Sequence, residues 1–254
     1  MPQSAGVISL YCFPLTLCFM IPKEFMTLFD SLSRSHGSTE VFRDFLDVFL
    51  FVLSCGKYRE DYARIDRLYD EQENRIFMRM VQVVADHSEG FRDIIGEVFM
   101  EHISHGHNGQ FFTPQHVSDL MAVVTCANIR PGQSVYDPTC GSGRMLLSAV
   151  KSLSRTNPND RIFCYGSDID LTCVKMTAIN MLMNSVPGEI AWMNTLTLEH
   201  WRSYQLNLVR VANVWLPTFT VLEAGHTNLV LRVQESLKNR KAMSAGELQL
   251  SFEF

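Results

Sequence analysis

Two short stretches of this sequence place chemically useful residues directly after an apolar segment. In the first, Asp137 and Pro138 are followed by Gly141 and Gly143, and a helical pattern begins behind them. The proline fixes the angle at which the chain leaves the strand, and the glycines let the backbone come close to a ligand. A glycine turn between a strand and a helix is common by itself, so this stretch alone is a weak signal.

The second stretch is Gly166-Ser167-Asp168, which ends the next apolar segment and places Asp168 25 residues after Gly143. An acid at the end of the second strand is suited to accept hydrogen bonds from ribose hydroxyls. A glycine loop combined with such an acid predicts a site for an adenosine-containing ligand.

The neighbouring residues narrow the choice of ligand. Arg144 follows Gly143, so the loop lacks the GK[ST] of a P-loop. A dinucleotide site favours a third glycine where Leu146 stands, and the carboxylate of Asp137 would repel a pyrophosphate. The same carboxylate suits the ammonium group of an amino-acid ligand.

Three motifs in one order carry a resemblance to a known family. They are Gly109-Gln110-Phe111-Phe112-Thr113-Pro114, Asp137-Pro138-Thr139-Cys140-Gly141-Ser142-Gly143 and Gly166-Ser167-Asp168-Ile169-Asp170. The stretch from Phe91 to Leu196 resembles the N6-adenine DNA methylases, and closely the modification subunit of type I restriction–modification systems. The resemblance implies S-adenosyl-L-methionine as cofactor and DNA with an adenine target as substrate.

The resemblance also implies which residues bind the cofactor. The first motif would lie over the methionine part, the glycine loop would wrap methionine and adenosine, and the acid would hold the ribose. Asn194 matches a residue that touches the adenine amino group at the end of the third strand. The implied cofactor-binding residues are Gln110, Phe111, Phe112, Thr113, Pro114, Asp137, Pro138, Cys140, Gly141, Ser142, Gly143, Asp168 and Asn194.

One family motif is missing from the sequence. In these enzymes [ND]PP[YF] holds the flipped base, but no such tetrapeptide follows Asn194, and Asn157-Pro158-Asn159-Asp160 lies on the wrong loop. We therefore assign no catalytic residue. Two hypotheses stay open: the cofactor-binding half of an adenine-specific DNA methyltransferase, truncated before that motif, or an inactive remnant that binds the cofactor and assembles with a complete methylase. A nucleotide-dependent oxidoreductase is a third.

Composition sets limits on partners and compartment. The net charge of −5 does not by itself indicate a protein that binds nucleic acid. A cluster around Arg232, Lys238, Arg240 and Lys241 fits either a local basic patch or a solvated helix face. Seven cysteines without a CxxC pair indicate a reducing compartment, so we expect a cytoplasmic protein. We also expect no membrane contact, because the apolar run near the N-terminus is too short to span a bilayer. A specificity subunit or a second methylase chain is the expected protein partner. We expect no metal site, although His102, His105 and His107 lie close together.

The elements that position these motifs follow from periodicity. Residues 25–104 show only helical patterns: a helix capped by Thr39 with an apolar stripe from Phe42 to Val52, another over Leu68–Ala85, and a third starting at Ser88. A different organisation begins at residue 105, so residues 25–104 are expected to be a helical N-terminal domain.

Strands and helices alternate after residue 109. Thr113-Pro114 opens a helix whose predicted inward face is Val117, Leu120, Met121 and Val124. Strands are expected at 134–137, 162–165 and 189–193, and helices at 145–154 and 171–183. This alternation predicts an α/β fold with a partial parallel sheet, and the resemblance makes it Rossmann-like, of the class I S-adenosylmethionine-dependent methyltransferase type.

The two ends carry weaker signals. Residues 1–24 contain an apolar run too short to span a membrane and interrupted by Pro14, which fits a buried segment or a mis-assigned start at Met20 or Met26. We expect the residues before Met20 to be dispensable. The cofactor-binding domain is expected over residues 105–205, and residues 206–254 as a tail of uncertain structure with one strand near 227–233.

Overall fold

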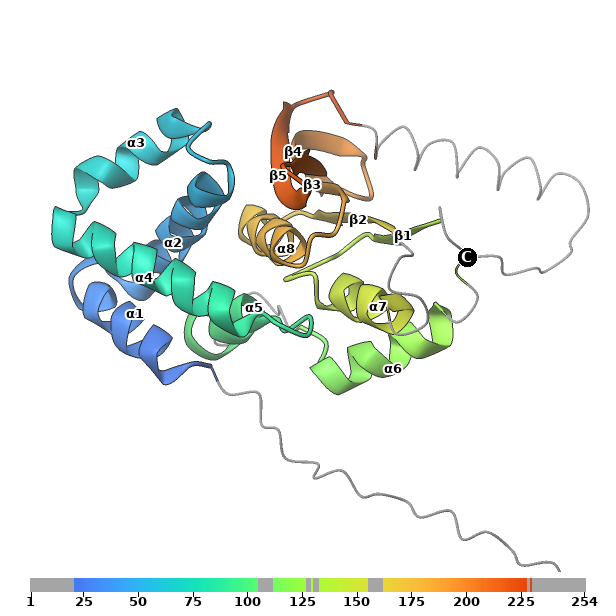
Figure 1. Ribbon diagram of the computed structural model, residues 1–254, viewed down its shortest axis with the longest axis horizontal. Helices are drawn as coiled ribbons and strands as arrows, with labels where there is room; N and C mark the ends of the chain where they lie inside the picture. Colours follow the sequence, from blue (N-terminus) through green and yellow to red (C-terminus); the bar gives the residue numbers. More distant parts are fainter. Residues whose placement is uncertain are drawn as a thin grey trace, which may run out of the picture.

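The computed structural model describes residues 21–104, 112–126, 129, 133–154, 162–227 and 229. Its helices lie on both sides of α8, which packs against the sheet (Figure 1). The helices are α1 (Lys23–His36), α2 (Ser38–Leu53), α3 (Arg59–Leu68), α4 (Glu71–His87), α5 (Ile94–Val98), the π-helix η1 (Phe99–Ser104), α6 (Gln115–Thr125), α7 (Arg144–Ser154) and α8 (Leu171–Met183).

The helix ends correct several predicted caps. Gly37, not Thr39, precedes α2. Asp70 caps α4 because its carboxylate accepts a bond from the Glu73 amide at 2.8 Å, and the Glu73 carboxylate accepts from the Asp70 amide at 3.0 Å. Ser88 ends α4 instead of starting the next helix, and Asp93 caps α5.

Five strands form one mixed sheet in the order β1-β2-β3-β4-β5. They are β1 (Ser134–Asp137), β2 (Phe163–Asp168), β3 (Gly188–Asn194), β4 (Glu199–Val211) and β5 (Val214–Glu223). The predicted parallel pairing of β1, β2 and β3 is confirmed, while β4 and β5 add antiparallel strands that the sequence did not predict. The α/β prediction is thus confirmed, with a sheet that is only partly parallel.

The hairpin changes the expected ending of the sheet. Residues 205 and 206, the predicted boundary of the tail, both lie inside β4. The turn between the strands is Ala212-Asn213, both with positive φ (45° and 70°), as in two-residue hairpin turns. Thr227 and Leu229 lie outside any strand, and the rest of the strand expected at 227–233 falls outside the described residues.

One hydrophobic core joins the helical region and the sheet. It runs without a break from Phe25 in α1 to Phe219 in β5. Lys175 of α8 pairs with Asp47 of α2, and the Tyr58 ring stacks on Phe219 with 5.2 Å between ring centroids. The two regions therefore share an interior and are not separately packed.

The predicted inward face of α6 is wrong. Leu120 and Val124 are 65% and 70% exposed, whereas Ser118 and Ala122 are buried. The helix turns its polar side to α7 because Asp119 accepts bonds from Ser148 at 2.7 Å and Lys151 at 2.9 Å.

Among the described residues, none of the helices has both the length and the apolarity needed to cross a bilayer.

Candidate cofactor-binding site

The polar residues singled out from the sequence meet at one edge of the sheet. Asp137, Asp168 and Asn194 are the last residues of β1, β2 and β3. Because these strands are parallel, their carboxyl ends lie together, which is where ligands bind in open α/β sheets. All three side chains are only partly buried and thus accessible.

The glycine loop between β1 and α7 needs its glycines for two reasons. Gly141 and Gly143 have φ of 55° and 85°, a region that other residues rarely adopt. A Cβ on Gly141 would lie 2.9 Å from the Phe112 ring, and one on Gly143 would lie 2.9 Å from Thr177 Cγ2. The loop is therefore packed tightly between Phe112 and α8.

Asp168 holds the loop directly. Its Oδ2 accepts a hydrogen bond from the Gly141 amide at 3.0 Å, and its Oδ1 accepts one from the Asp170 amide at 3.0 Å. Each carboxylate oxygen has a second lone pair, so ribose hydroxyls can still be bound.

Asp137 adds a second carboxylate to the same edge. Its Oδ1 accepts a bond from the Thr139 amide at 3.1 Å. Burial raises the pKa of both Asp137 and Asp168, and the charge of Asp168 raises that of Asp137 further. Two mutually repelling carboxylates favour a cationic ligand and disfavour an anionic one.

Asn194 has its side-chain oxygen bonded to the main chain. Its Oδ1 already accepts bonds from the amides of Leu196 at 3.0 Å and Thr197 at 3.2 Å. Its Nδ2 makes no hydrogen bond to the described residues, so this donor can face a ring nitrogen of a purine. Ile169 and Leu196, 64% and 95% exposed, supply apolar surface beside it.

The first motif is partly visible. Gln110 and Phe111 lie outside the described residues. The Phe112 ring stacks on Phe99 of η1, with 5.5 Å between centroids and an interplanar angle of 16°. Pro114, not Thr113, is the residue that precedes α6, and Thr113 bonds through its carbonyl oxygen to Arg144 at 3.2 Å.

Three predicted site residues form hydrogen bonds to other residues of the protein. Cys140 is buried, its Sγ accepts a bond from the Thr177 hydroxyl at 3.4 Å, and burial raises the pKa of this thiol. The Pro138 carbonyl accepts from Thr195 at 2.8 Å, and the buried Ser142 hydroxyl donates to Asp93. A ligand would meet their main chain more than their side chains.

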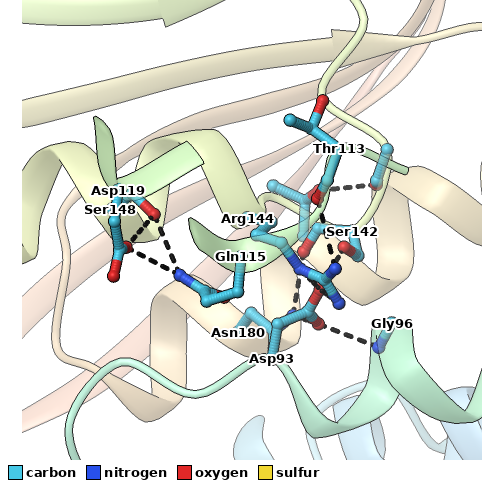
Figure 2. Close-up of polar contacts among 11 residues, drawn as sticks. Asp93, Gly96, Thr113, Gln115, Asp119, Ser142, Arg144, Ser148 and Asn180 are labelled. Carbon is cyan, nitrogen blue, oxygen red and sulfur yellow. Dashed lines mark hydrogen bonds and ion pairs between the residues drawn. The ribbon is translucent and has the colours of Figure 1, made fainter. Parts of the chain in front are cut away.

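The sequence did not reveal Asp93. Its carboxylate lies beside the glycine loop, between α5 and α7 (Figure 2). Its position before Ile94-Ile95 is typical of a helix cap, but the contact with Ser142, 49 residues away, has no local signal.

The described residues contain no group of three or more histidine, cysteine or acidic side chains arranged to hold a metal. His102 is part of η1, and His105 and His107 lie outside the described residues.

Comparison with known proteins assigns a family. The model of the N-6 DNA methylase family matches residues 91–221, just over half of the chain. The type I restriction enzyme MpnII methylase subunit of Mycoplasma pneumoniae is 31% identical over 102 residues, which are 39% of this chain and 19% of that protein. The MjaIX methylase subunit of Methanocaldococcus jannaschii is 31% identical over 83 residues, 32% of this chain and 14% of that protein.

The matched segments thus span less than a fifth of these relatives. A solved structure from Listeria monocytogenes, described as a class I S-adenosylmethionine-dependent methyltransferase, aligns with a TM-score of 0.46 at 11% identity, over 66% of this chain and 51% of that one. With the motifs in family order and the family model matching across them, the chain belongs to the N-6 DNA methylase family.

Proposed function

We propose that this chain binds S-adenosylmethionine at the carboxyl edge of β1, β2 and β3, as the cofactor-binding part of an adenine-N6 DNA methyltransferase of type I. The observation that carries the proposal is the junction of the Gly141–Gly143 loop with Asp168, where the Gly141 amide donates to the carboxylate at 3.0 Å. At this junction a hydrogen bond joins the glycine loop to the acid that would bind the ribose.

The residues present fit this cofactor. Asp137 and Asp168 would favour its ammonium and sulfonium charges, and Asp168 would accept bonds from its ribose. Asn194 would donate to a ring nitrogen of the adenine, beside Ile169 and Leu196. When bound, the cofactor would supply a methyl group on a positively charged sulfur.

A dinucleotide fits less well. Leu146 is fully buried where a third glycine would let the backbone approach a pyrophosphate. Arg144, the cation that directly follows the glycine loop, is engaged by Asp93 at 3.0 Å and is therefore not available to neutralise a phosphate. These features weigh against the oxidoreductase hypothesis.

The proposal has three further parts. The substrate is DNA with an adenine target, the protein partner is a specificity subunit or a second methylase chain, and the setting is the cytoplasm. The relatives, which are methylase subunits of type I restriction enzymes, support the proposal. The alternative is a non-catalytic chain that binds the cofactor and assembles with a complete methylase. The absence of [ND]PP[YF] from the 254 residues favours that alternative for this chain alone.

Calorimetric titration of the full chain tests the proposal. We expect heat of binding with S-adenosylmethionine and S-adenosylhomocysteine, and none with NAD. Absence of binding to both sulfur ligands, or equal affinity for NAD, would overturn it.

A further inference from the structure

We infer that Asp93 is a positioning residue for the cofactor site. Its carboxylate fixes the glycine loop and, through Arg144, the Phe112-Thr113 segment. The inference rests on the proposed function, because it concerns the affinity of the same site.

Asp93 carries a fully buried carboxylate. Its side chain has 0% exposure, and it comes from the segment before α5, outside the sheet. It accepts bonds from the Gly96 amide at 2.8 Å and Asn180 Nδ2 at 2.8 Å, and also from the Ser142 hydroxyl. A buried charge is stable only when it is paired and hydrogen-bonded, so these donors hold it in one position.

Arg144 links this carboxylate to the first motif. Its Nε and Nη2 both lie 3.0 Å from Asp93 Oδ2, while its Nη1 donates to the Thr113 carbonyl at 3.2 Å (Figure 2). The guanidinium is planar and rigid, so orienting one edge orients the other. Thr113 follows Phe112, whose ring covers Gly141.

The loop is tied to the same point a second time. Asn180 of α8 donates from Nδ2 to Asp93 at 2.8 Å and to the Ser142 carbonyl at 2.8 Å. Ser142 is therefore held through both its hydroxyl and its carbonyl, between Gly141 and Gly143.

Asp93 acts through these neighbours and not by contact with a ligand. Its carboxylate is enclosed, whereas the groups expected to meet the cofactor are Gly141, which is next to the anchored Ser142, and Thr113, whose carbonyl oxygen is held by Arg144. Replacing the carboxylate by an amide removes the charge that orients Arg144 while keeping the side-chain shape.

The test uses the full chain with Asp93→Asn, Arg144→Gln and the double variant, each titrated with S-adenosylhomocysteine. We expect each single variant to bind roughly tenfold more weakly and the double variant to be little weaker than either, because residues in one network are not additive. Arg144→Lys, which keeps the positive charge, should recover part of the loss.

The control is Asp44→Asn. Asp44 is also buried and bonds to Arg64 and Tyr69, but it lies in the helical region away from the site. It should lower the thermal midpoint without changing the affinity. Amide NMR signals of Gly141 and Gly143 in the unliganded Asp93→Asn protein should shift, while that of Gly225 should not.

The outcomes separate the two ideas. If the unmodified chain binds the ligand, and Asp93→Asn binds it equally with unmoved Gly141 and Gly143 signals, the inference is wrong while the proposed function stands. If the unmodified chain does not bind, both are overturned. Should Asp93→Asn fail to fold, Arg144→Gln breaks the ion pair with Asp93 and the link to Thr113, and unchanged affinity and unmoved signals there would equally refute the positioning role.

Discussion

The Gly141 amide donates a hydrogen bond to Oδ2 of Asp168 at 3.0 Å, so the glycine loop is tied directly to the end of β2. Asp168 thereby shapes the loop and is also the carboxylate proposed to bind the ribose. A substitution of Asp168 should therefore affect ligand binding both through the shape of the loop and through the loss of the carboxylate.

Asp168→Ala is expected to weaken S-adenosylhomocysteine binding strongly, since each hydrogen bond to a charged group contributes about 1.5–3 kcal/mol. Calorimetric titration measures the effect. Asp170→Asn is the matched control, because Asp170 caps α8 through the Thr172 amide and an asparagine caps equally well. Equal affinity in the Asp168→Ala protein would contradict the ribose role.

Gly96→Ala should destabilise the protein although it replaces a helical glycine. Such a change usually gains up to about 1 kcal/mol. Here the new Cβ would lie 2.2 Å from Asp93 Oδ2 and 2.6 Å from Ser142 Cβ, and forced repacking costs about 1–3 kcal/mol. Urea unfolding measures the stability.

Gly90→Ala serves as the control for Gly96→Ala. Gly90 has a φ of 76° and nothing within 4 Å of its Cβ position, so alanine there strains only the local backbone. It should leave ligand affinity unchanged, whereas Gly96→Ala should also weaken binding. A stable Gly96→Ala protein with full affinity would show that α5 does not constrain the loop.

Glu97 predicts a pH dependence of stability. Burial first, and then the charges of Asp93 and Glu101, raise its pKa from 4.5 to about 7, against the opposing effects of Arg144 and Arg92. The folded state therefore holds a proton that the unfolded state has lost between pH 4.5 and about 7. The contribution of Glu97 to stability is full below pH 4.5 and is lost as the pH rises to about 7.

Urea unfolding of the unmodified chain and Glu97→Gln from pH 5 to about 8 checks this sign. Glutamine stays neutral, so the stability of the unmodified chain should fall relative to the variant until about pH 7 and run parallel above it. Two curves that are parallel throughout would show that Glu97 ionises normally.

The chain alone should not methylate DNA, although we expect it to bind the cofactor. The motifs in the sequence are those proposed to bind the cofactor, and none of them would hold a flipped adenine in line with the methyl group. Transfer of a labelled methyl group to mixed-sequence DNA, with and without a co-expressed specificity subunit or second methylase chain, is the measurement. Robust transfer by the purified chain would contradict this prediction and direct attention to Trp201, Asn213 and His200. The ring nitrogens of His200 already bond to the Ser203 hydroxyl and the Gly225 amide.

Features with a local physical cause were predictable from the sequence. The bounds of α8 and β1 match the predictions, because an apolar run and a terminating turn determine each element nearby. The convergence of Asp137 and Asp168 followed from the parallel pairing of their strands. These parts of the candidate site depend on short segments only.

Features set by contacts between distant segments were not predictable in this way. The inward face of α6 differs from the predicted one because Asp119 pairs with Ser148 and Lys151 of α7, and this pairing outweighs the exposure of Leu120 and Val124. The hairpin had a weak signal, since Tyr204 and Leu206 alternate with polar residues before Ala212-Asn213. Nothing near Asp93 in the sequence points to Ser142.

The shared core that runs from Phe25 to Phe219 has a consequence for how the protein responds to its ligand. Because the helices and the sheet share this core, they should unfold in a single cooperative transition. A ligand present at a hundred times its dissociation constant stabilises the folded state by about 2.7 kcal/mol. That free energy should therefore slow amide hydrogen exchange in α1 as well as at the edge of β1, β2 and β3, so that occupancy of the site can be measured from a helix that does not touch it.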